Sequence, residues 1–220
     1  MDVLSARLRA AADPIFRAQL EHPFVQAIGD GTLDPDRFRY YLKQDYLFLI
    51  EYARTLALAC ARAPRLELME RFAELTRATL STEMALHRSY ALQWQIAADE
   101  LEREAMSPTT RAYTDFLVRT AAVGDYAELL AALLPCMWGY SEIGRALAAR
   151  QPPATQPFAA WIETYAADDF AELARWCRDA LDTVATTTAE DRLREPFLLS
   201  SRYELAFWEM AWHKEAQPPL

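Results

Sequence analysis

Glycine and proline are scarce in this chain, and their scarcity restricts the folds it can adopt. Only 5 of 220 residues are Gly, and the 12 Pro lie mainly between segments with helical apolar periodicity. These two residue types are the strongest breaks in a helical pattern, and no segment alternates in the manner of a strand. No repeat or interdomain linker is visible either. We therefore expect an all-α helical bundle in which residues 1–220 form a single domain.

The helix breakers also predict where the helices begin and end. Asp34 followed by Pro35 combines an N-cap side chain with a proline at the first helical position, so a long helix is expected from there to about Ala63. Further helices are expected at about 3–20, 23–28, 64–96, from Ser107 to the break at Gly124, from there to a loop at 151–157, at 158–184 with a break near Ala166, and at 190–212.

Composition excludes several classes of function. The net charge is −9, and Lys and Arg are interleaved with Asp and Glu, which argues against nucleic acid as a partner. The beginning of the chain lacks the pattern of a secretory signal, and the longest uncharged apolar run, 129–140, is too short to span a bilayer. Three cysteines without a Cys-x-x-Cys pair support neither disulfides nor a zinc site, and Cys60 and Cys177 are interpreted as core or incidental. We expect a cytoplasmic protein that binds neither nucleic acid nor membrane.

The segment LLPCMWGYSEIG, residues 133–144, combines a proline and a thiol inside an apparent buried helix. Pro135 removes a backbone donor, so a kink is expected that opens space beside Cys136. Helical spacing then puts Cys136, Gly139 and Tyr140 on one face, which we interpret as a pocket wall. A free cysteine is more often a small apolar filler of a core, so Cys136 alone does not establish chemistry.

Carboxyl groups interrupt two aromatic stripes. One face of the long helix carries Tyr41, Asp45, Phe48 and Tyr52, and one face of the last helix carries Ser200, Glu204, Phe207, Trp208 and Ala211. Acids are rarely buried without a partner. Each acid could be an ordinary core residue paired with an arginine or a phenol, and Tyr113 and Tyr165 could be core residues with tethered hydroxyls.

Taken together, a thiol, two carboxyl groups, phenols and flat aromatic walls suit a planar nitrogen heterocycle. Rings stack on it, carboxyl groups bind its amino groups and ring nitrogens, and a thiolate attacks an electron-poor carbon. Glu204 could exchange a proton with a ring nitrogen near neutral pH. No histidine is obviously placed to form a Cys-His pair with Cys136.

Six segments of the chain resemble the TenA or thiaminase II family in order and spacing. They are HPFVQAIGDGTL (22–33), YYLKQDYLFL (40–49), EMALH (83–87), LLPCMWGYSEIG (133–144), WIETYAADDF (161–170) and FWEMAW (207–212). The resemblance covers nearly the whole chain. It implies a heme-oxygenase-like fold, usually a homotetramer, and a salvage hydrolase that uses no metal and no cofactor. The implied reaction converts 4-amino-5-aminomethyl-2-methylpyrimidine to hydroxymethylpyrimidine and ammonia, and the enzyme can also cleave thiamin.

The resemblance also implies roles for particular residues of the cysteine-containing subclass. Cys136 would be the nucleophile that adds to the pyrimidine ring, Glu204 would exchange a proton with a ring nitrogen, and Asp45 would bind the 4-amino group and the adjacent nitrogen. The remaining expected substrate-binding residues are Phe48, Tyr113, Tyr140, Tyr165 and Phe207. Phe48 departs from the family, which usually has tyrosine at this position, so a hydroxyl that orients the site is missing.

Two alternatives stay open. A metal-dependent oxygenase of the same fold is the less favoured one: Glu83 and His87 could ligate from one helix face, but the chain has only three His and no second Glu-plus-His pair. The absent hydroxyl at Phe48 motivates the other, a pyrimidine-binding relative without catalysis or with altered specificity.

Overall fold

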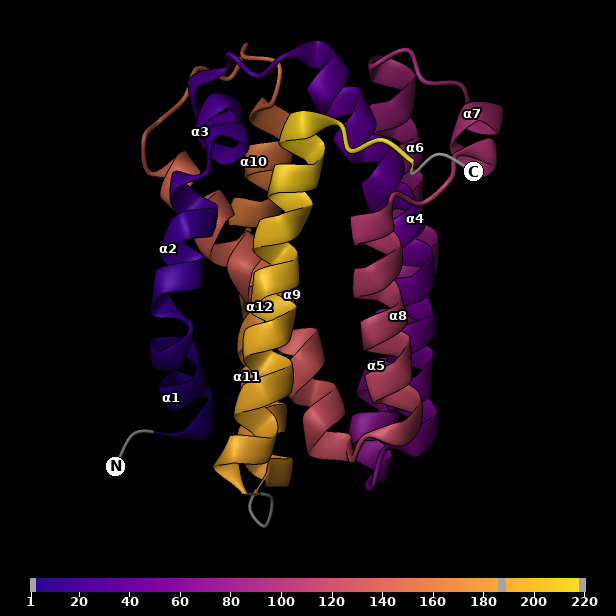
Figure 1. Ribbon diagram of the computed structural model, residues 1–220, viewed down its shortest axis with the longest axis vertical. Helices are drawn as coiled ribbons and strands as arrows, with labels where there is room; N and C mark the ends of the chain where they lie inside the picture. Colours follow the sequence, from indigo (N-terminus) through magenta and orange to yellow (C-terminus); the bar gives the residue numbers. More distant parts are fainter. Residues whose placement is uncertain (1–2, 186–188, 218–220) are drawn as a thin grey trace. The chain divides into compact units, whose positions relative to one another are not determined.

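The computed structural model describes residues 3–185 and 189–217, and within them every regular element is a helix (Figure 1). The elements are α1 (Leu4–Ala11), α2 (Asp13–Glu21), α3 (Pro23–Asp30), α4 (Pro35–Arg62), α5 (Leu66–Ala78), the π-helical segment η1 (Thr79–Glu83), α6 (Met84–Gln93), α7 (Ala98–Arg103), α8 (Pro108–Val123), α9 (Tyr126–Ala148), α10 (Ala159–Ala166), α11 (Asp168–Val184) and α12 (Glu190–His213). The predicted all-α class is confirmed.

The chain divides into two compact helical units, each made of segments that are distant in sequence. The first unit comprises residues 1–33 and 127–212, and the second comprises residues 34–126 and 213–220. Each unit has its own buried side chains. The expectation that residues 1–220 act as one domain stays a prediction.

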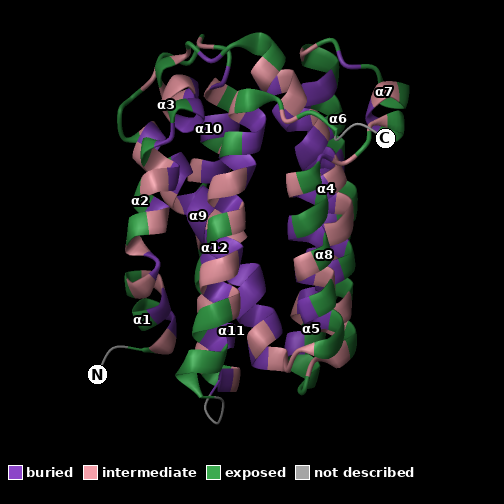
Figure 2. Cartoon of the chain, in the orientation of Figure 1, coloured by how far each residue is buried: buried purple, intermediate pink, exposed green. Residues whose placement is uncertain are grey.

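Helix α9 forms the centre of the first unit. Sixteen of its residues are buried, nearly its whole length, and Figure 2 shows it mostly in the colour of buried residues. Apolar side chains on all sides of a helix are typical of a core helix. At the edge of the unit α1 is tied to α11, because the backbone N–H and the hydroxyl of Ser5 donate to the two carboxylate oxygens of Asp182 at 2.8 and 2.7 Å.

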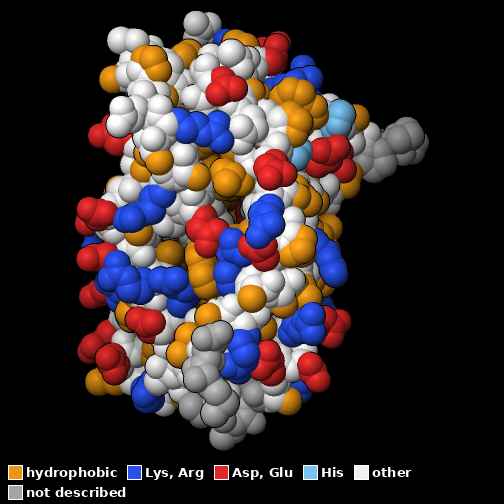
Figure 3. Space-filling model, turned by 90° about the vertical axis from the view of Figure 1, so that its left-hand side faces the viewer, with side chains coloured by type: hydrophobic (Ala, Val, Ile, Leu, Met, Phe, Trp, Pro, Cys, Tyr) orange, Lys and Arg blue, Asp and Glu red, His pale blue; other side chains and the backbone are white. Residues whose placement is uncertain are grey.

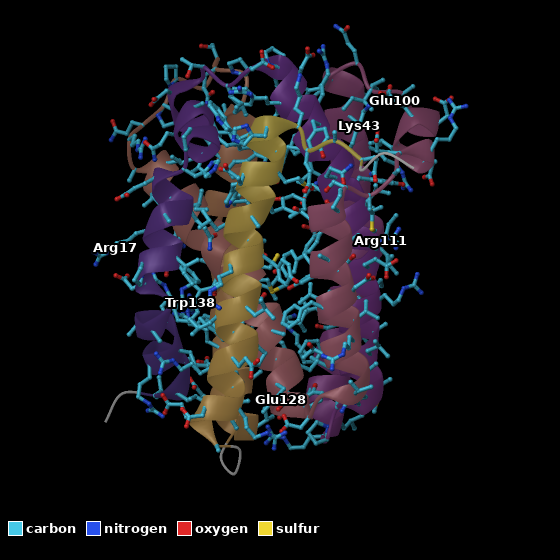
Figure 4. All side chains as sticks on the ribbon, in the orientation of Figure 1. Arg17, Lys43, Glu100, Arg111, Glu128 and Trp138 are labelled. Carbon is cyan, nitrogen blue, oxygen red and sulfur yellow. The ribbon has the colours of Figure 1, made fainter. Side chains whose placement is uncertain are left out.

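Helix α4 organises the second unit and packs against α5, α6 and α8. Its start is the predicted one: the Asp34 side chain accepts from the backbone N–H groups of Asp36 and Arg37. Lys43 in the first third of α4 forms ion pairs with Glu100 of α7 and with Glu104, which follows α7, and these pairs attach α7 to α4 (Figure 4).

The residues that follow α12 are bound into the second unit. Glu215 accepts from the backbone N–H of Thr109 at 3.0 Å and from its hydroxyl at 3.1 Å. The Tyr40 hydroxyl donates to the Glu215 carbonyl at 2.8 Å, and the Gln217 amide donates to the Met106 carbonyl at 2.6 Å. This tail therefore covers the start of α8.

Two of the predicted helices differ from those in the structure. The expected helix at 3–20 is split at Ala12, because Pro14 in the first turn of α2 starts a new helix. The expected helix at 64–96 begins at Leu66, is interrupted by η1 and ends at Gln93, and α7 was not predicted. Helix α9 continues through Pro135, and α12 continues through Pro196, as the predicted spans do.

The described helices are too short or too polar to cross a lipid bilayer. On the face shown in Figure 3, Lys and Arg side chains are interspersed with Asp and Glu.

Candidate active site

The residues expected to form the site are divided between the two units. Cys136 and Tyr140 on α9, Tyr165 on α10, and Glu204 and Phe207 on α12 belong to the first unit; Asp45 and Phe48 on α4 and Tyr113 on α8 belong to the second. Each group is described by itself below.

Two contacts fix how α9 and α12 lie against each other in the first unit. The Ser200 hydroxyl donates to the Ala132 carbonyl at 2.7 Å. Further along both helices, the ring centroids of Tyr140 and Trp208 are 5.2 Å apart. Both pairs are separated by 68 positions in the sequence. The two helices therefore run in the same direction and keep one register over these two turns.

This register puts Cys136 and Glu204 at the same level of the two helices. Each lies one helical turn after the Ala132–Ser200 contact and one turn before the Tyr140–Trp208 contact. The thiol is half-buried, and Glu204 is only 3% exposed. The thiol and one of the two acids that the sequence singled out therefore lie at one level of two helices in contact. Phe207, 2% exposed, follows Glu204 by three residues and is buried on the same helix.

Tyr140 and Tyr165 also come together. Their ring centroids are 4.7 Å apart and the rings are inclined by 58°. Gly144 makes this possible, because a Cβ at that position would lie 2.7 Å from the Ala166 backbone nitrogen and overlap the Tyr165 backbone. The missing side chain lets the end of α10 approach α9 and holds Tyr165 beside Tyr140.

Gly139 does not share the face of Tyr140, contrary to the sequence expectation. A Cβ on Gly139 would point toward α2, 3.3 Å from the Gln19 side-chain oxygen and 4.0 Å from the Phe16 ring. Successive residues of an α-helix are rotated by about 100°, so adjacent positions face different neighbours. Gly139 therefore faces α2.

In the second unit, Phe48 and Tyr113 are in ring contact. Their centroids are 5.1 Å apart, and the Tyr52 ring stacks on Phe48 itself with a centroid distance of 5.5 Å. Phe48 and Tyr113 are 4% and 1% exposed. The position where the family usually has a tyrosine is therefore enclosed by aromatic rings from α4 and α8.

Asp45 is paired with a histidine, a partner that the sequence did not suggest. Oδ2 of Asp45 lies 2.5 Å from Nε2 of His87, and both side chains are buried. The other ring nitrogen, Nδ1, lies 3.2 Å from the backbone carbonyl oxygen of Glu83. The segment EMALH indicates that Glu83 and His87 lie one helical turn apart, and this spacing also suits a pair of metal ligands, but it does not reveal Asp45 as the partner of His87.

The charges around His87 favour its protonated form. Burial alone would lower the pKa of His87, but the hydrogen bond and the charge of Asp45, together with the charge of Glu83, raise it above its ordinary value. Burial raises the pKa of Glu83, opposed by the charge of His87. No group of three or more His, Cys, Asp or Glu suited to hold a metal occurs within residues 3–185 and 189–217.

Known proteins resemble this chain over nearly its full length. A model of the TENA/THI-4/PQQC family matches residues 9–214. The chain belongs to this family. It is 43% identical to the aminopyrimidine aminohydrolase of Halalkalibacterium halodurans, over 96% of both chains. It is 38% identical to the aminopyrimidine aminohydrolase of Bacillus subtilis, over 96% of this chain and 90% of the relative.

Solved structures of the TENA/THI-4/PQQC family have the same fold. A TenA homologue from P. horikoshii superposes with a TM-score of 0.91 at 31% identity, over 96% of this chain and 99% of the other. A cyanobacterial heme oxygenase-1 from Synechocystis superposes with a TM-score of 0.69 at 15% identity, over 97% and 94% of the two chains. The second likeness concerns the fold alone, and it confirms the predicted heme-oxygenase-like architecture.

Proposed function

We propose that this chain is an aminopyrimidine aminohydrolase of thiamin metabolism. Its reaction converts 4-amino-5-aminomethyl-2-methylpyrimidine and water to hydroxymethylpyrimidine and ammonia, and thiamin is a further candidate substrate. Two relatives of that name, 43% and 38% identical over 96% of this chain, support the assignment. The observation that carries it is the common level of Cys136 and Glu204 on α9 and α12, one turn from contacts on either side.

In the proposed mechanism, the Cys136 thiolate adds to an electron-poor carbon of the pyrimidine ring while Glu204 gives a proton to a ring nitrogen. Electron density in the dearomatised ring then expels the protonated amino group from the exocyclic methylene carbon as ammonia. Water adds to that carbon and loses a proton, and departure of the thiolate, with return of the ring-nitrogen proton to Glu204, restores aromaticity. Asp45 binds the 4-amino group throughout.

Aromatic side chains also have binding roles in this proposal. Phe207 stacks on the ring, and Tyr113, Tyr140 and Tyr165 supply hydroxyls and walls. The contact between the rings of Tyr140 and Tyr165 supports their joint role as one wall.

Assays of the purified protein with the aminomethyl pyrimidine, thiamin and related pyrimidines test the proposal, with products followed by chromatography. Release of hydroxymethylpyrimidine supports the assignment. Absence of turnover with every pyrimidine would refute it.

A pyrimidine-binding relative without catalysis is the second candidate, and Phe48 favours it. Phe48 packs against the rings of Tyr52 and Tyr113, and its own side chain has no hydroxyl to contribute at this position. Calorimetric binding of a pyrimidine by a protein without turnover would favour this candidate over the hydrolase. Measurement of iron and zinc in the same sample tests the metal-dependent oxygenase.

We also propose that the protein acts in the cytoplasm as a homotetramer, as the family resemblance implies. The three cysteines, all free thiols, support a reducing compartment.

A further inference from the structure

The two hydrogen bonds of the His87 ring need two protons, whereas a neutral histidine ring carries only one. Nε2 of His87 faces the Asp45 carboxyl oxygen, and Nδ1 faces the Glu83 carbonyl oxygen. A carbonyl oxygen only accepts, so Nδ1 must carry hydrogen. The short Nε2–Oδ2 contact then needs a second proton, either on the imidazole or on Asp45.

The surrounding charges place that proton on the imidazole. Asp45 on α4 and Glu83 at the end of η1 are the groups whose charges raise the pKa of His87. From α7, Glu100 is paired with Lys43. Next to His87 on α6 itself, Arg88 donates to the Tyr46 hydroxyl, outside the pair. The buried pair is therefore an imidazolium and a carboxylate.

We propose that His87 is a positioning residue that holds Oδ2 of Asp45, so that Asp45 meets the amino group of the pyrimidine through Oδ1. This inference rests on the proposed function, in which Asp45 binds that amino group. A carboxylate that is fixed at one oxygen cannot rotate about its last bond, and its plane is set before the ligand arrives. The imidazolium also places a positive charge next to Asp45 in a buried site.

The backbone before His87 supports a specialised role. His87 lies in the first turn of α6, four residues after the last residue of η1, a π-helical segment, and such segments occur frequently at functional sites. The carbonyl group that orients the His87 ring belongs to Glu83, the last residue of η1. The π turn and the imidazole thus form one support for Asp45.

Two substitutions separate orientation from charge. In His87→Gln the side-chain amide still donates to Asp45 but has no charge, and in His87→Leu both properties are lost. We expect kcat/KM for the aminomethyl pyrimidine to fall about tenfold in His87→Gln and about a hundredfold in His87→Leu, mainly through KM. The alkaline decline of kcat/KM that follows loss of the His87 proton should disappear in His87→Gln.

His22→Asn is a matched control. His22 is also a buried histidine beside a carboxylate, with Nε2 2.8 Å from Glu209, and its ring accepts from the backbone N–H of Phe24. Asparagine preserves an acceptor at this helix start. This variant should keep the wild-type pH profile and a kcat/KM within about threefold.

Nitrogen NMR of the imidazole tests the inference even in a protein without turnover. In wild type, His87 should show two ring N–H groups at neutral pH, and Asp45→Asn should shift its titration to lower pH. A neutral His87 ring at pH 7, or a folded His87→Leu with wild-type pyrimidine affinity by calorimetry, would overturn the proposal. The two proposals can fail separately. If the wild-type protein shows no turnover, but its His87 is an imidazolium and His87→Leu binds the pyrimidine more weakly, the hydrolase assignment is refuted and this inference stands.

Discussion

The half-buried Cys136 is distinguished from the other two cysteines by its position in the fold. It lies on α9 at the level of Glu204 on α12. Cys177 contacts the sulfur of Met137 at 3.3 Å, and Cys60 contacts the carbonyl of Met69 at 3.4 Å. An acid on the neighbouring helix is what a nucleophile adding to a basic ring requires.

Cys136→Ser should abolish hydrolysis and leave pyrimidine affinity within about tenfold, because the sulfur acts on bonds rather than holding the ligand. Cys177→Ser is the matched control in the same unit and should retain activity. Turnover assays and calorimetry on the two variants provide the test. Near-normal turnover of Cys136→Ser would remove Cys136 from its assigned role.

Phe48→Tyr should preserve or raise the rate of hydrolysis, since it restores the hydroxyl that the family usually has at this position. The buried ring already contacts Tyr113, so the new hydroxyl needs a polar partner to be tolerated. Steady-state kinetics with a thermal melt measure both effects. A folded but inactive variant would mean that the site is built differently from the family pattern.

Stability at different pH values tests the charge of His87. The pKa of His87 is raised in the folded protein. Its contribution to the free energy of unfolding is therefore fully present below about pH 6.5, the ordinary pKa of a histidine, and is lost as the pH rises through the pKa of the folded protein. The difference in unfolding free energy between wild type and His87→Gln should therefore be larger at pH 6 than at pH 9. Urea denaturation at the two pH values measures it, and an equal difference would argue against a protonated His87.

At the scale of the elements, the sequence predicts helix boundaries that depend on nearby residues, but it does not predict how each helix is rotated about its own axis. The Asp34 cap and the break between α10 and α11 follow from residues next to each boundary. The π turn η1 arises within an uninterrupted helical pattern, and the partner of Asp45 comes from 42 positions away. Such features depend on how each helix is rotated against its neighbours, which one sequence does not determine.

Gly144→Ala tests the close approach of α10 to α9. The added methyl group would overlap the Tyr165 backbone, so we expect a loss of about 1–3 kcal/mol in unfolding free energy and weaker pyrimidine binding. Gly139→Ala is the control, because its methyl group would meet only the Gln19 side-chain oxygen at 3.3 Å and the Phe16 ring at 4.0 Å. Chemical denaturation compares the two; equal stability would contradict the packing role of Gly144.

At the scale of the whole molecule, each unit is assembled from separated parts of the chain. Residues 1–33 pack with 127–212, so the first unit is complete only when the last helix is present. Pairing of such distant segments slows folding, because loops must close before the contacts form.

The proposed homotetramer predicts a mass of four chains of 25.1 kDa in solution. Light scattering after size-exclusion chromatography measures this mass directly. A single chain of 25.1 kDa at micromolar concentration would contradict the proposal.

The position of Glu215 has a practical consequence for protein production. Its carboxylate accepts a hydrogen bond from the backbone N–H of Thr109 in the first turn of α8, and the Gln217 side chain donates to the carbonyl of Met106 nearby. An affinity tag that replaces the chain from Lys214 onward would remove the acceptors of the Thr109 N–H and of the Tyr40 hydroxyl, whereas Val3 at the other end is 58% exposed and offers room for a fusion. Expression vectors with an amino-terminal tag are thus the safer choice for crystallisation and kinetics.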